Sequence, residues 1–386
     1  MLSVFHIITG LEAGGAERVL YCLIKDDRDK EHIVVSFTDE GYYGPLLKDL
    51  GIKVITLHLN NVFKVIAGIF RLLSLIKSHK PDIFVTWMIH ASLLGGLVAK
   101  LSSNSPIIWN FRGTIFTPGG GKELFYNFLL KACSLLSDKI PSKIICCAES
   151  ISEELVDIKF PNSKITVIPN GYDLNIFKPR PDYRKEVRSN LGISENLLFL
   201  GMFARWDPQK NIDELVHALS LMKKKGQRFK MLLAGSGINN EKLTALINIC
   251  DLKNEVILLD QSPNVEKIMN SLDIHILSSS YGEGFPNVIC ETMACGIPNV
   301  STNVGDSSFI IQENGWIASD TSRFGLADAI SNAIKDYENN EVFLEKKHNS
   351  EKRIKEKFTL EKMISSYTMV IESCLEEITQ SKSRHD

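Results

Sequence analysis

Two glutamates lie close together in the stretch EGFPNVICETMACGIP, residues 283–298, and could bind a polar ligand between them. The apolar run at residues 273–278 predicts a buried parallel strand. Residues 286–295 predict a helix, because a proline is tolerated in the first helical turn. Glu283 would then follow the carboxyl end of a strand, where ligands of open α/β sheets bind, and Glu291 would lie in the helix's second turn. The helix macrodipole alone would also favour either carboxylate, so other motifs must separate a binding role from a structural one.

Positive side chains follow the strand that is predicted at residues 197–203. Arg205 and Lys210 lie in the loop at its carboxyl end, where a bound diphosphate would need positive charge. Asn211, the next residue, can cap the helix that follows. Two solvated surface charges would give the same sequence, so both interpretations of the cations remain open.

Glycine-rich turns follow several predicted strands. Residues 10–17, GLEAGGAE, come directly after a strand predicted at residues 4–9 and open a helix. Such a turn brings backbone N–H groups and a helix N-terminus close to a phosphate. Residues 235–237, GSG, form a second tight turn, and residues 170–173, NGYD, would alone be an ordinary turn. Because the first turn is not a GxGxxG, it is weak evidence by itself.

Strand and helix patterns alternate twice along the 386 residues, a length for which about two domains are expected. Such alternation is typical of parallel, doubly wound sheets. Two prolines in residues 178–181 predict a linker. We therefore expect an α/β protein with Rossmann-like domains at residues 1–180 and 181–360, and a C-terminal helix with a polar tail at residues 361–386. The expected strands span residues 4–9, 32–37, 53–57, 82–87, 107–111, 143–147 and 164–169 in the first half, and 197–203, 230–234, 256–259, 273–278 and 299–301 in the second. Helices are expected at residues 62–79 and 90–101, among others.

The composition is that of a soluble globular protein, with 44% apolar and 23% charged residues. A formal net charge of −2 gives no reason to expect a nucleic-acid partner. The 8 cysteines show no CxxC spacing, so we expect small core residues in a reducing, cytoplasmic compartment. The chain begins with a strand-like segment rather than a signal peptide, and no segment offers ~20 uncharged apolar residues that could span a bilayer.

Taken together, these motifs resemble those of family 4 glycosyltransferases, which are retaining enzymes with the GT-B fold. The resemblance covers residues 3–335, and its most specific part is a Glu-x7-Glu motif at residues 283–291, followed by MACG. The other matching positions are residues 14–17 and 170–173, Phe177, Pro179, Arg205 and Lys210. Residues 90–95, Trp109 with Arg112, and residues 304–306 resemble a subgroup from bacterial polysaccharide and lipopolysaccharide gene clusters. The resemblance implies two Rossmann-like domains whose parallel sheets face each other across a cleft.

The resemblance also implies a nucleotide-sugar site in the second domain. Arg205 and Lys210 would hold the donor diphosphate and stabilise the charge that develops as the sugar leaves, while Glu283 would bind that sugar. Glu291 would accept hydrogen bonds from the ribose hydroxyls. The other donor-binding positions are Gly284, Phe285, Asn287 and Val288, and Gly15 of the first domain. Residues 285–286 are expected to form an exposed corner. Arginine, lysine and N–H groups would neutralise the diphosphate and no DxD motif is evident, so we expect no metal and no cofactor. A UDP-sugar is the favoured donor.

The first domain would bind the acceptor, and here the chain departs from the family. Many members have a histidine where this chain has Arg112, so we expect Arg112 to contact the donor sugar or the acceptor, together with His90. Residues 62–73 predict an apolar helix with interspersed basic residues, for which two interpretations stay open. The helix packs on the sheet, or it rests on an anionic membrane near a lipid-linked sugar.

These inferences predict a retaining hexosyl- or N-acetylhexosaminyltransferase. It would move a sugar from a nucleotide-diphosphate sugar to a glycan or a polyprenyl-diphosphate-linked saccharide in surface polysaccharide assembly, in the cytoplasm or at the inner face of the membrane. A glycoside hydrolase would also use two carboxylates, but it would not need Arg205 and Lys210 for a diphosphate. A sugar-nucleotide epimerase and a non-catalytic binding protein are the remaining alternatives. The nucleobase, the sugar and the linkage are left open.

Overall fold

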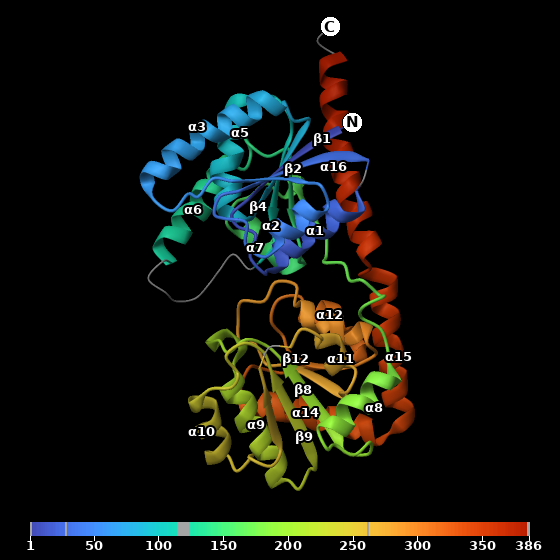
Figure 1. Cartoon of the computed structure of the whole chain (residues 1–386). Coiled ribbons are helices and arrows are strands. Elements are labelled where there is room, and N and C mark those ends of the chain that lie inside the picture. The colour runs from blue at the N-terminus through green and yellow to red at the C-terminus, as the bar shows by residue number, and fades with distance from the viewer. Residues whose placement is uncertain (1, 28, 114–122, 261, 384–386) are drawn as a thin grey trace. The chain divides into compact units, whose positions relative to one another are not determined.

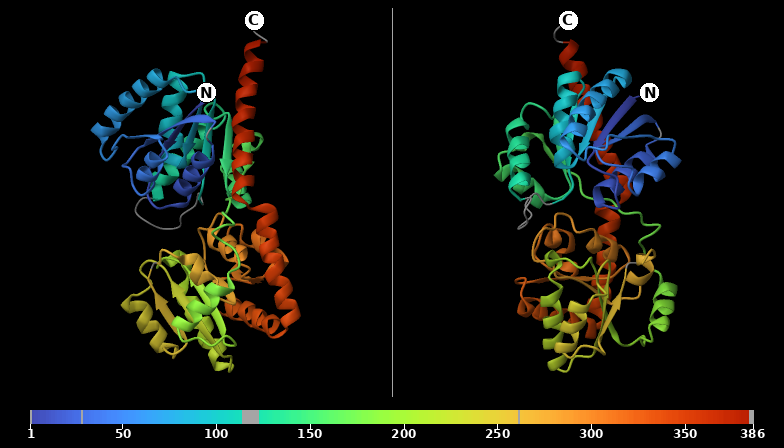
Figure 2. Two further views of the ribbon diagram at one scale, coloured as in Figure 1. Left: turned by 45° about the vertical axis from the view of Figure 1, so that its right-hand side comes forward. Right: turned by 60° about the vertical axis from the view of Figure 1, so that its left-hand side comes forward.

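The computed structural model describes residues 2–27, 29–113, 123–260 and 262–383 (Figures 1 and 2). The chain divides into two compact units, Met1–Gly171 with Leu360–Asp386, and Tyr172–Thr359. The first boundary lies after residue 171 rather than after residue 180, and the C-terminal segment expected at residues 361–386 belongs to the first unit. Its side chains share the hydrophobic core of the first sheet through Met363, Tyr367, Ile371 and Cys374. Both units are α/β, which confirms the expected fold class.

The first unit is built on a seven-stranded parallel sheet with the order β3-β2-β1-β4-β5-β6-β7. Its inner strands are apolar and buried, as expected for a parallel sheet that helices cover on both faces. Every strand expected in the first half of the chain is present, with small shifts at the ends. The strands are β1 (Leu2–Ile8), β2 (Lys30–Ser36), β3 (Lys53–Thr56), β4 (Ile83–Trp87), β5 (Ile107–Phe111), β6 (Lys143–Cys146) and β7 (Ile165–Val167).

Helices connect and cover these strands (Figure 1). They are α1 (Gly15–Asp26), α2 (Tyr43–Asp49), α3 (Val62–His79), α4 (Met88–His90), the π-helical turn η1 (Ala91–Gly95), α5 (Gly96–Ser102), α6 (Glu123–Leu136), α7 (Glu149–Asp157), the 3-10 turn η2 (Asn162–Lys164) and α16 (Leu360–Ser383). The helix expected at residues 90–101 is therefore interrupted by η1. Gly95 and Gly96 press against the sheet at this point, since an added Cβ would lie 2.8 Å from Ile7 and 2.6 Å from Trp109, respectively. This close approach requires glycine.

Helix α3 spans the residues that the sequence predicts for it. Asn61 Oδ1 accepts a hydrogen bond from the Lys64 amide at 2.9 Å and caps its N-terminus, while Lys80 ends it in a left-handed conformation. The helix packs on the unit through Gly68, Leu72 and Ile76. More than half of the side-chain surface is exposed at Val62, Phe63, Ile66 and Phe70. Among the helices of the described ranges, α3 included, none is long and apolar enough to cross a membrane.

The second unit contains a six-stranded parallel sheet with the order β10-β9-β8-β11-β12-β13. Its strands are β8 (Leu198–Phe203), β9 (Phe229–Ala234), β10 (Val256–Leu259), β11 (Ile274–Leu277), β12 (Asn299–Thr302) and β13 (Trp316–Ala318). β13 is not among the strands predicted from the sequence, because its three residues are too few to show a periodic pattern. It pairs with β12 and completes one edge of the sheet.

The helices of this unit are α8 (Pro181–Asn190), η3 (Pro208–Lys210), α9 (Ile212–Lys224), α10 (Glu241–Ile249), α11 (Val265–Met269), α12 (Asn287–Ala294), α13 (Ser307–Ile311), η4 (Gln312–Asn314), α14 (Arg323–Glu338) and α15 (Asn340–Lys357). A buried ion pair ties α8 to the sheet. Arg188, which is fully buried, bonds Asp273 Oδ2 at 2.6 Å, and Arg184 bonds Asp273 Oδ1 at 2.8 Å. The amide of Phe199 donates to the same carboxylate at 2.8 Å, so the buried charge is well satisfied.

Candidate active site

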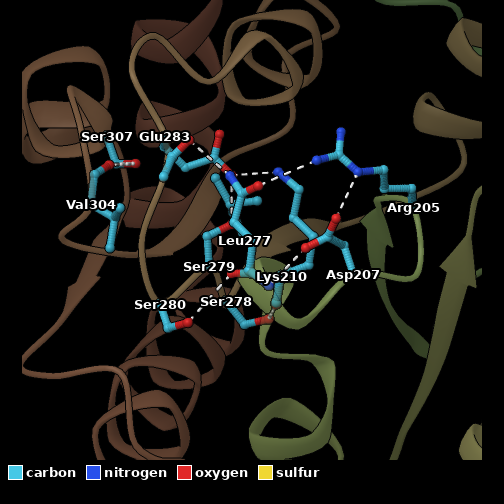
Figure 3. A network of polar contacts seen from close by, with 12 residues as sticks. Arg205, Asp207, Lys210, Leu277, Ser278, Ser279, Ser280, Glu283, Val304 and Ser307 are labelled. Carbon is cyan, nitrogen blue, oxygen red and sulfur yellow. Dashed lines mark hydrogen bonds and ion pairs between the residues drawn. The ribbon is translucent and has the colours of Figure 1, made fainter. Parts of the chain in front are cut away.

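The loops after β8 and β11 join at the carboxyl end of the second sheet, where these strands are neighbours. Ser278 Oγ donates to the carbonyl of Lys210 at 2.7 Å, and the amide of Ser280 donates to the carbonyl of Gln209 at 2.9 Å. Gln209 Nε2 in turn donates to the carbonyl of Gly282 at 2.8 Å. These bonds hold the two predicted binding loops against each other (Figure 3).

Lys210 and Glu283 form an ion pair at this junction (Figure 3). Their side chains are 15% and 11% exposed, so the pair is largely removed from water. Ser279 Oγ donates to the same carboxylate oxygen of Glu283 at 2.6 Å. Low exposure strengthens the attraction and makes either charge costly without a partner. An anion that binds Lys210 therefore has to replace Glu283 as its partner or share it.

Arg205 lies in the same loop and is the more exposed cation, with 61% of its side chain accessible. Its Nε lies 3.1 Å from Asp207 Oδ2, and its Nη2 donates to Gln209 Oε1 at 3.3 Å (Figure 3). Burial raises the pKa of Asp207, but the hydrogen bonds from the Gln209 amide and from Arg205 outweigh it and leave this pKa below its usual range. Asp207 is therefore ionised at neutral pH and orients the guanidinium of Arg205.

Asn211 occupies the N-cap position of α9, but its side chain does not cap the helix, so this prediction is wrong. Its backbone adopts a left-handed conformation with φ of 52°, which asparagine tolerates better than most residues. Asn211 Nδ2 donates instead to the carbonyl of Thr321 at 2.8 Å. The side chain thereby ties the cationic loop to the segment before α14.

A loop after β12 closes on the loop that carries Glu283. The amide of Asp306 donates to the carbonyl of Gly284 at 2.8 Å. Gly305 has a positive φ of 57°, and a Cβ atom there would collide with the carbonyl groups of Glu283 and Gly284. Glycine at this position lets the two loops meet and fixes the backbone of the predicted sugar-binding segment.

Phe285 and Asn287 stand at the start of α12. The sequence predicts an exposed corner here, but Phe285 is 6% exposed and its ring packs edge-on against Phe358, with 5.3 Å between ring centroids. That prediction is wrong because the aromatic partner comes from the distant end of α15. Asn287 Oδ1 accepts a hydrogen bond from Tyr172 Oη at 2.7 Å. At Phe285 the backbone, rather than the side chain, is therefore the part that can face a ligand.

Val288 and Glu291 both lie on α12 and are partly buried. Glu291 is in the second turn, as predicted, and is four residues beyond Asn287, so the two side chains share one helix face. The structure thus brings Arg205, Lys210 and Glu283 to one loop junction and places Glu291 on the helix that follows. Their predicted roles toward a ligand remain predictions.

The candidate residues of the first unit follow β1, β4 and β5, which are neighbouring strands. Gly15 begins α1 and is exposed, and His90 ends α4 and is also exposed. Arg112 comes directly after β5 and is partly buried. The strand order therefore places the three residues near the carboxyl end of the first sheet, after neighbouring strands.

Arg112 is held by a network that the sequence analysis missed. Its Nη1 donates to Tyr367 Oη at 2.6 Å, and its Nη2 donates to Asn170 Oδ1. Tyr367 Oη also accepts a hydrogen bond from Asn110 Nδ2 at 2.8 Å, and its ring stacks on Trp87. Burial raises the pKa of Tyr367 to about 12, so its hydroxyl stays neutral. Tyr367 lies on α16, in a segment that its polar composition identified only as a helix with a tail.

Two family models match the chain in succession. The model described as Glycosyltransferase Family 4 matches residues 13–176, and the model described as Glycosyl transferases group 1 matches residues 183–356. All of the site residues predicted from the sequence fall inside these two segments.

Two relatives and one solved structure can be compared with the chain over most of its length. The capsular polysaccharide biosynthesis glycosyltransferase CapM of Staphylococcus aureus is 24% identical over 321 residues, 77% of this chain and 78% of CapM. The N,N'-diacetylbacillosaminyl-diphospho-undecaprenol alpha-1,3-N-acetylgalactosaminyltransferase of Campylobacter jejuni is 27% identical over 284 residues, 71% of this chain and 73% of the relative. The crystal structure of Anabaena HepE in complex with UDP has a TM-score of 0.85 at 22% identity and covers 97% of this chain and 100% of HepE. The last comparison shows a shared fold.

Proposed function

The chain belongs to the family 4 glycosyltransferases, with the GT-B fold, and from this premise we propose its substrates and the roles of its residues. It transfers a sugar, with retention of configuration, from a nucleotide-diphosphate sugar to a lipid-linked saccharide in surface polysaccharide assembly. The observation that carries the proposal is the cation cluster, which consists of Arg205 and Lys210 in the loop after β8. In this cluster Lys210 forms a largely buried ion pair with Glu283 of the loop after β11.

The cation cluster binds the donor diphosphate in this proposal. Lys210 exchanges Glu283 for a phosphate oxygen, and Arg205 adds a second charge from the loop surface. Negative charge grows on the diphosphate as its bond to the sugar breaks, so fixed cations stabilise the transition state more than the ground state. Glu283, released from Lys210, accepts hydrogen bonds from the sugar, and Glu291 accepts them from the ribose. Arg205, Lys210 and backbone amides supply this neutralisation without a metal ion.

The substrate classes are supported by what is known of similar proteins. The Campylobacter jejuni relative is named for a diphospho-undecaprenol-linked acceptor, and the relative CapM for capsular polysaccharide biosynthesis. The fold neighbour HepE was crystallised with UDP, which favours a UDP-sugar as the donor of this chain. The rival activities, glycoside hydrolysis and sugar-nucleotide epimerisation, receive no such support.

The donor is tested by thermal unfolding in the presence of UDP-, GDP- and ADP-sugars, because a ligand of the native state raises the melting temperature by mass action. We expect protection by UDP-sugars and its loss in Lys210→Met, with Lys224→Met, an exposed lysine at the end of α9, as the control. The protecting sugar is then incubated with a polyprenyl-diphosphate-linked saccharide. Mass spectrometry should show the addition of one sugar, and a free sugar or an epimerised donor as the sole product would contradict the proposal.

The apolar face of α3 is proposed to contact the membrane that holds the acceptor. Val62, Phe63, Ile66 and Phe70 recur at helical spacing on one face, opposite the residues that pack on the unit. The exposed Lys64 follows Phe63 in the same helical turn, and its long side chain would attract anionic lipid. Part of α6 adds exposed apolar side chains to the same unit, at Leu124, Phe125 and Phe128. This arrangement is typical of a peripheral contact rather than of a span.

Binding to phosphatidylglycerol vesicles tests this contact. A Phe63→Ser, Phe70→Ser protein should bind at least about tenfold more weakly, because each buried aromatic side chain contributes about 1.5–3 kcal/mol. Leu344→Ser removes a similarly exposed apolar side chain from α15 and is the control. Added salt should weaken the wild-type interaction by screening. Equal binding of the wild type and the α3 variant would leave this helix with only its packing role.

A further inference from the structure

A pocket of about 310 Å³ lies in the same unit as the donor loops but at another place. It is lined by the start of α8, the end of α12 and the middle of α15. The backbone amide of Arg180 donates to Asn270 Oδ1 at 2.7 Å there, and Asn270 precedes the amino end of β11. The donor loops follow the carboxyl end of that strand, so this α8–α15 pocket is a separate site.

Two cations in the α8–α15 pocket have no acidic partner among the residues that the structure describes. Arg180 stacks on the ring of Tyr183, with 5.4 Å from Cζ to the ring centroid, and its Nε is buried without a hydrogen-bond acceptor. The ammonium of Lys347 on α15 makes no ion pair or hydrogen bond within the described ranges, and it lies 6.0 Å from the ring centroid of Phe343. Burial lowers the pKa of Lys347 and the positive charges of Arg184 and Arg188 lower it further, while Asp273, which is bonded to those two arginines, opposes the shift without outweighing it. Both cations would gain from an anion placed between them.

The other charged groups of the pocket are already neutralised. Arg184 bonds Asp273 at 2.8 Å and Glu195 at 3.3 Å. Glu351, the acidic side chain of the lining, forms an ion pair with Lys355 one turn further along α15. The unsatisfied charge of the pocket is therefore positive and comes from Arg180 and Lys347.

We propose that the α8–α15 pocket binds the phosphate group of a small soluble molecule. Arg180 and Lys347 come from two different parts of the chain that line the same pocket, and both can donate charge-assisted hydrogen bonds to a phosphate. The volume of about 310 Å³ is at the lower end of the range for small-molecule sites, so a phosphate with a small organic group fits it. The site is independent of the proposed donor site, and a ligand here is not a substrate of the transfer reaction.

Two helices connect this pocket with the donor loops. Gly296 of the pocket ends α12, whose first turn carries Asn287 of the predicted donor site. Helix α15 carries Lys347 and ends beside Phe358, whose ring contacts Phe285 of the donor loop. A phosphate that shifts either helix would change the affinity for the nucleotide, and by linkage the nucleotide would change the affinity for phosphate by the same factor.

Calorimetric titration with inorganic phosphate tests the site, at constant ionic strength and with UDP at saturation so that the donor cations are occupied. We expect phosphate to bind, and Lys347→Met and Arg180→Gln each to weaken it by about tenfold or more, since each removes a charge-assisted hydrogen bond. Lys185→Met, on the exposed surface of α8, is the matched control and should bind phosphate normally. Thermal melting verifies that each variant is folded, and Lys347→Met retains the length of the side chain.

A second titration uses the Arg205→Gln, Lys210→Met protein without UDP, so that the result does not depend on nucleotide binding. Phosphate binding that persists there and is lost when Lys347→Met is added supports the pocket. Binding that vanishes with the donor cations, or that is unchanged by Lys347→Met and Arg180→Gln, overturns it. Failure of UDP to bind would contradict the proposed donor site and would leave this second titration decisive for the pocket.

Discussion

In both units the candidate residues lie in loops at the carboxyl end of a parallel sheet, but the positively charged side chains have different partners. In the second unit, Lys210 is paired with the carboxylate of Glu283. In the first unit, Arg112 donates to the neutral oxygens of Tyr367 and Asn170. A lysine paired with a carboxylate can exchange that partner for a phosphate, whereas an arginine held by neutral oxygens keeps its charge and its position. The shared fold therefore determines where ligands bind, and the partners of the charged groups determine what each loop can do.

The largest effect should come from removing the exchangeable cation. Lys210→Met should lower kcat by about a hundredfold to a thousandfold, the scale seen when a preorganised donor to developing charge is lost. Lys210 and Glu283 are proposed to bind adjoining parts of the same donor, the leaving diphosphate and the sugar. Adding Glu283→Gln to Lys210→Met should therefore cost much less than the product of the two single effects. Steady-state kinetics of the single and double variants measures this. Independent, multiplicative losses would show that the pair is not a functional unit.

The buried histidines of the two sheets should stay neutral, in contrast to the charged loops. His275 in β11 is fully buried, and its pKa is lowered to about 4, mainly by burial and to a smaller extent by the charge of Lys210, although its hydrogen bond with Asn299 opposes this. His6 in β1 has its pKa lowered by burial and by the adjacent His32. Below a pH of about 6.5 the histidines of the unfolded chain become protonated, whereas these buried rings stay neutral in the folded protein. The free energy of unfolding therefore decreases as the pH falls.

For His275 this loss amounts to about 3 kcal/mol once the pH reaches its native pKa, at 1.36 kcal/mol for each pKa unit. Urea unfolding should show part of this loss as a lower free energy of unfolding at pH 5 than at pH 7. NMR of the imidazole protons checks the cause directly, because the ring should not titrate between these two values. If His275 titrates near pH 6.5, it does not contribute to the loss of stability at low pH.

The neutral network of the first unit should give a smaller effect. Tyr367→Phe keeps the stacked ring but removes one hydrogen bond to Arg112, which is worth about 1.5–3 kcal/mol for a charged donor. We expect about a tenfold loss in kcat/KM for the acceptor and an unchanged KM for the donor. The loss should disappear in an Arg112→Gln background. Cys374→Ala, a buried change on the same helix, is the control for general packing damage.

The smallest effect is expected at Glu291. If it binds the ribose about equally in the ground and transition states, Glu291→Gln should raise the donor KM several-fold and leave kcat almost unchanged. Initial rates over a range of donor concentrations measure both constants. A fall in kcat comparable to that of Lys210→Met would move Glu291 into the group that stabilises the leaving diphosphate.

Much of the fold could be predicted because parallel strands leave continuous apolar runs in the sequence. β4 and β5 are examples, since both are fully buried and were predicted almost to the residue. Two features of the fold could not be predicted from the local sequence pattern. β13 is three residues long, and the break at Gly95 and Gly96 depends on Ile7 and Trp109, which lie elsewhere in the sequence.

The candidate site was predictable where its residues lie in loops that directly follow predicted strands. Glu283 and Lys210 follow strands that a pattern reveals, so their meeting could be expected. Tyr367 and Phe358 could not be found in this way. Tyr367 lies on α16 and Phe358 directly follows α15, so both are far in the sequence from the residues that they contact. The wrong prediction at Asn211 has a similar cause, since its bond to the carbonyl of Thr321 depends on tertiary structure.

The central claim is that the cation cluster promotes departure of a nucleotide diphosphate toward an acceptor. The most direct test is the initial rate of UDP release from the protecting UDP-sugar, with and without a polyprenyl-diphosphate-linked saccharide, for the wild type and for folded Lys210→Met. The account predicts release that depends on the acceptor and is about a hundredfold slower in the variant. Release at the full rate without acceptor, or at the wild-type rate in Lys210→Met, would contradict it.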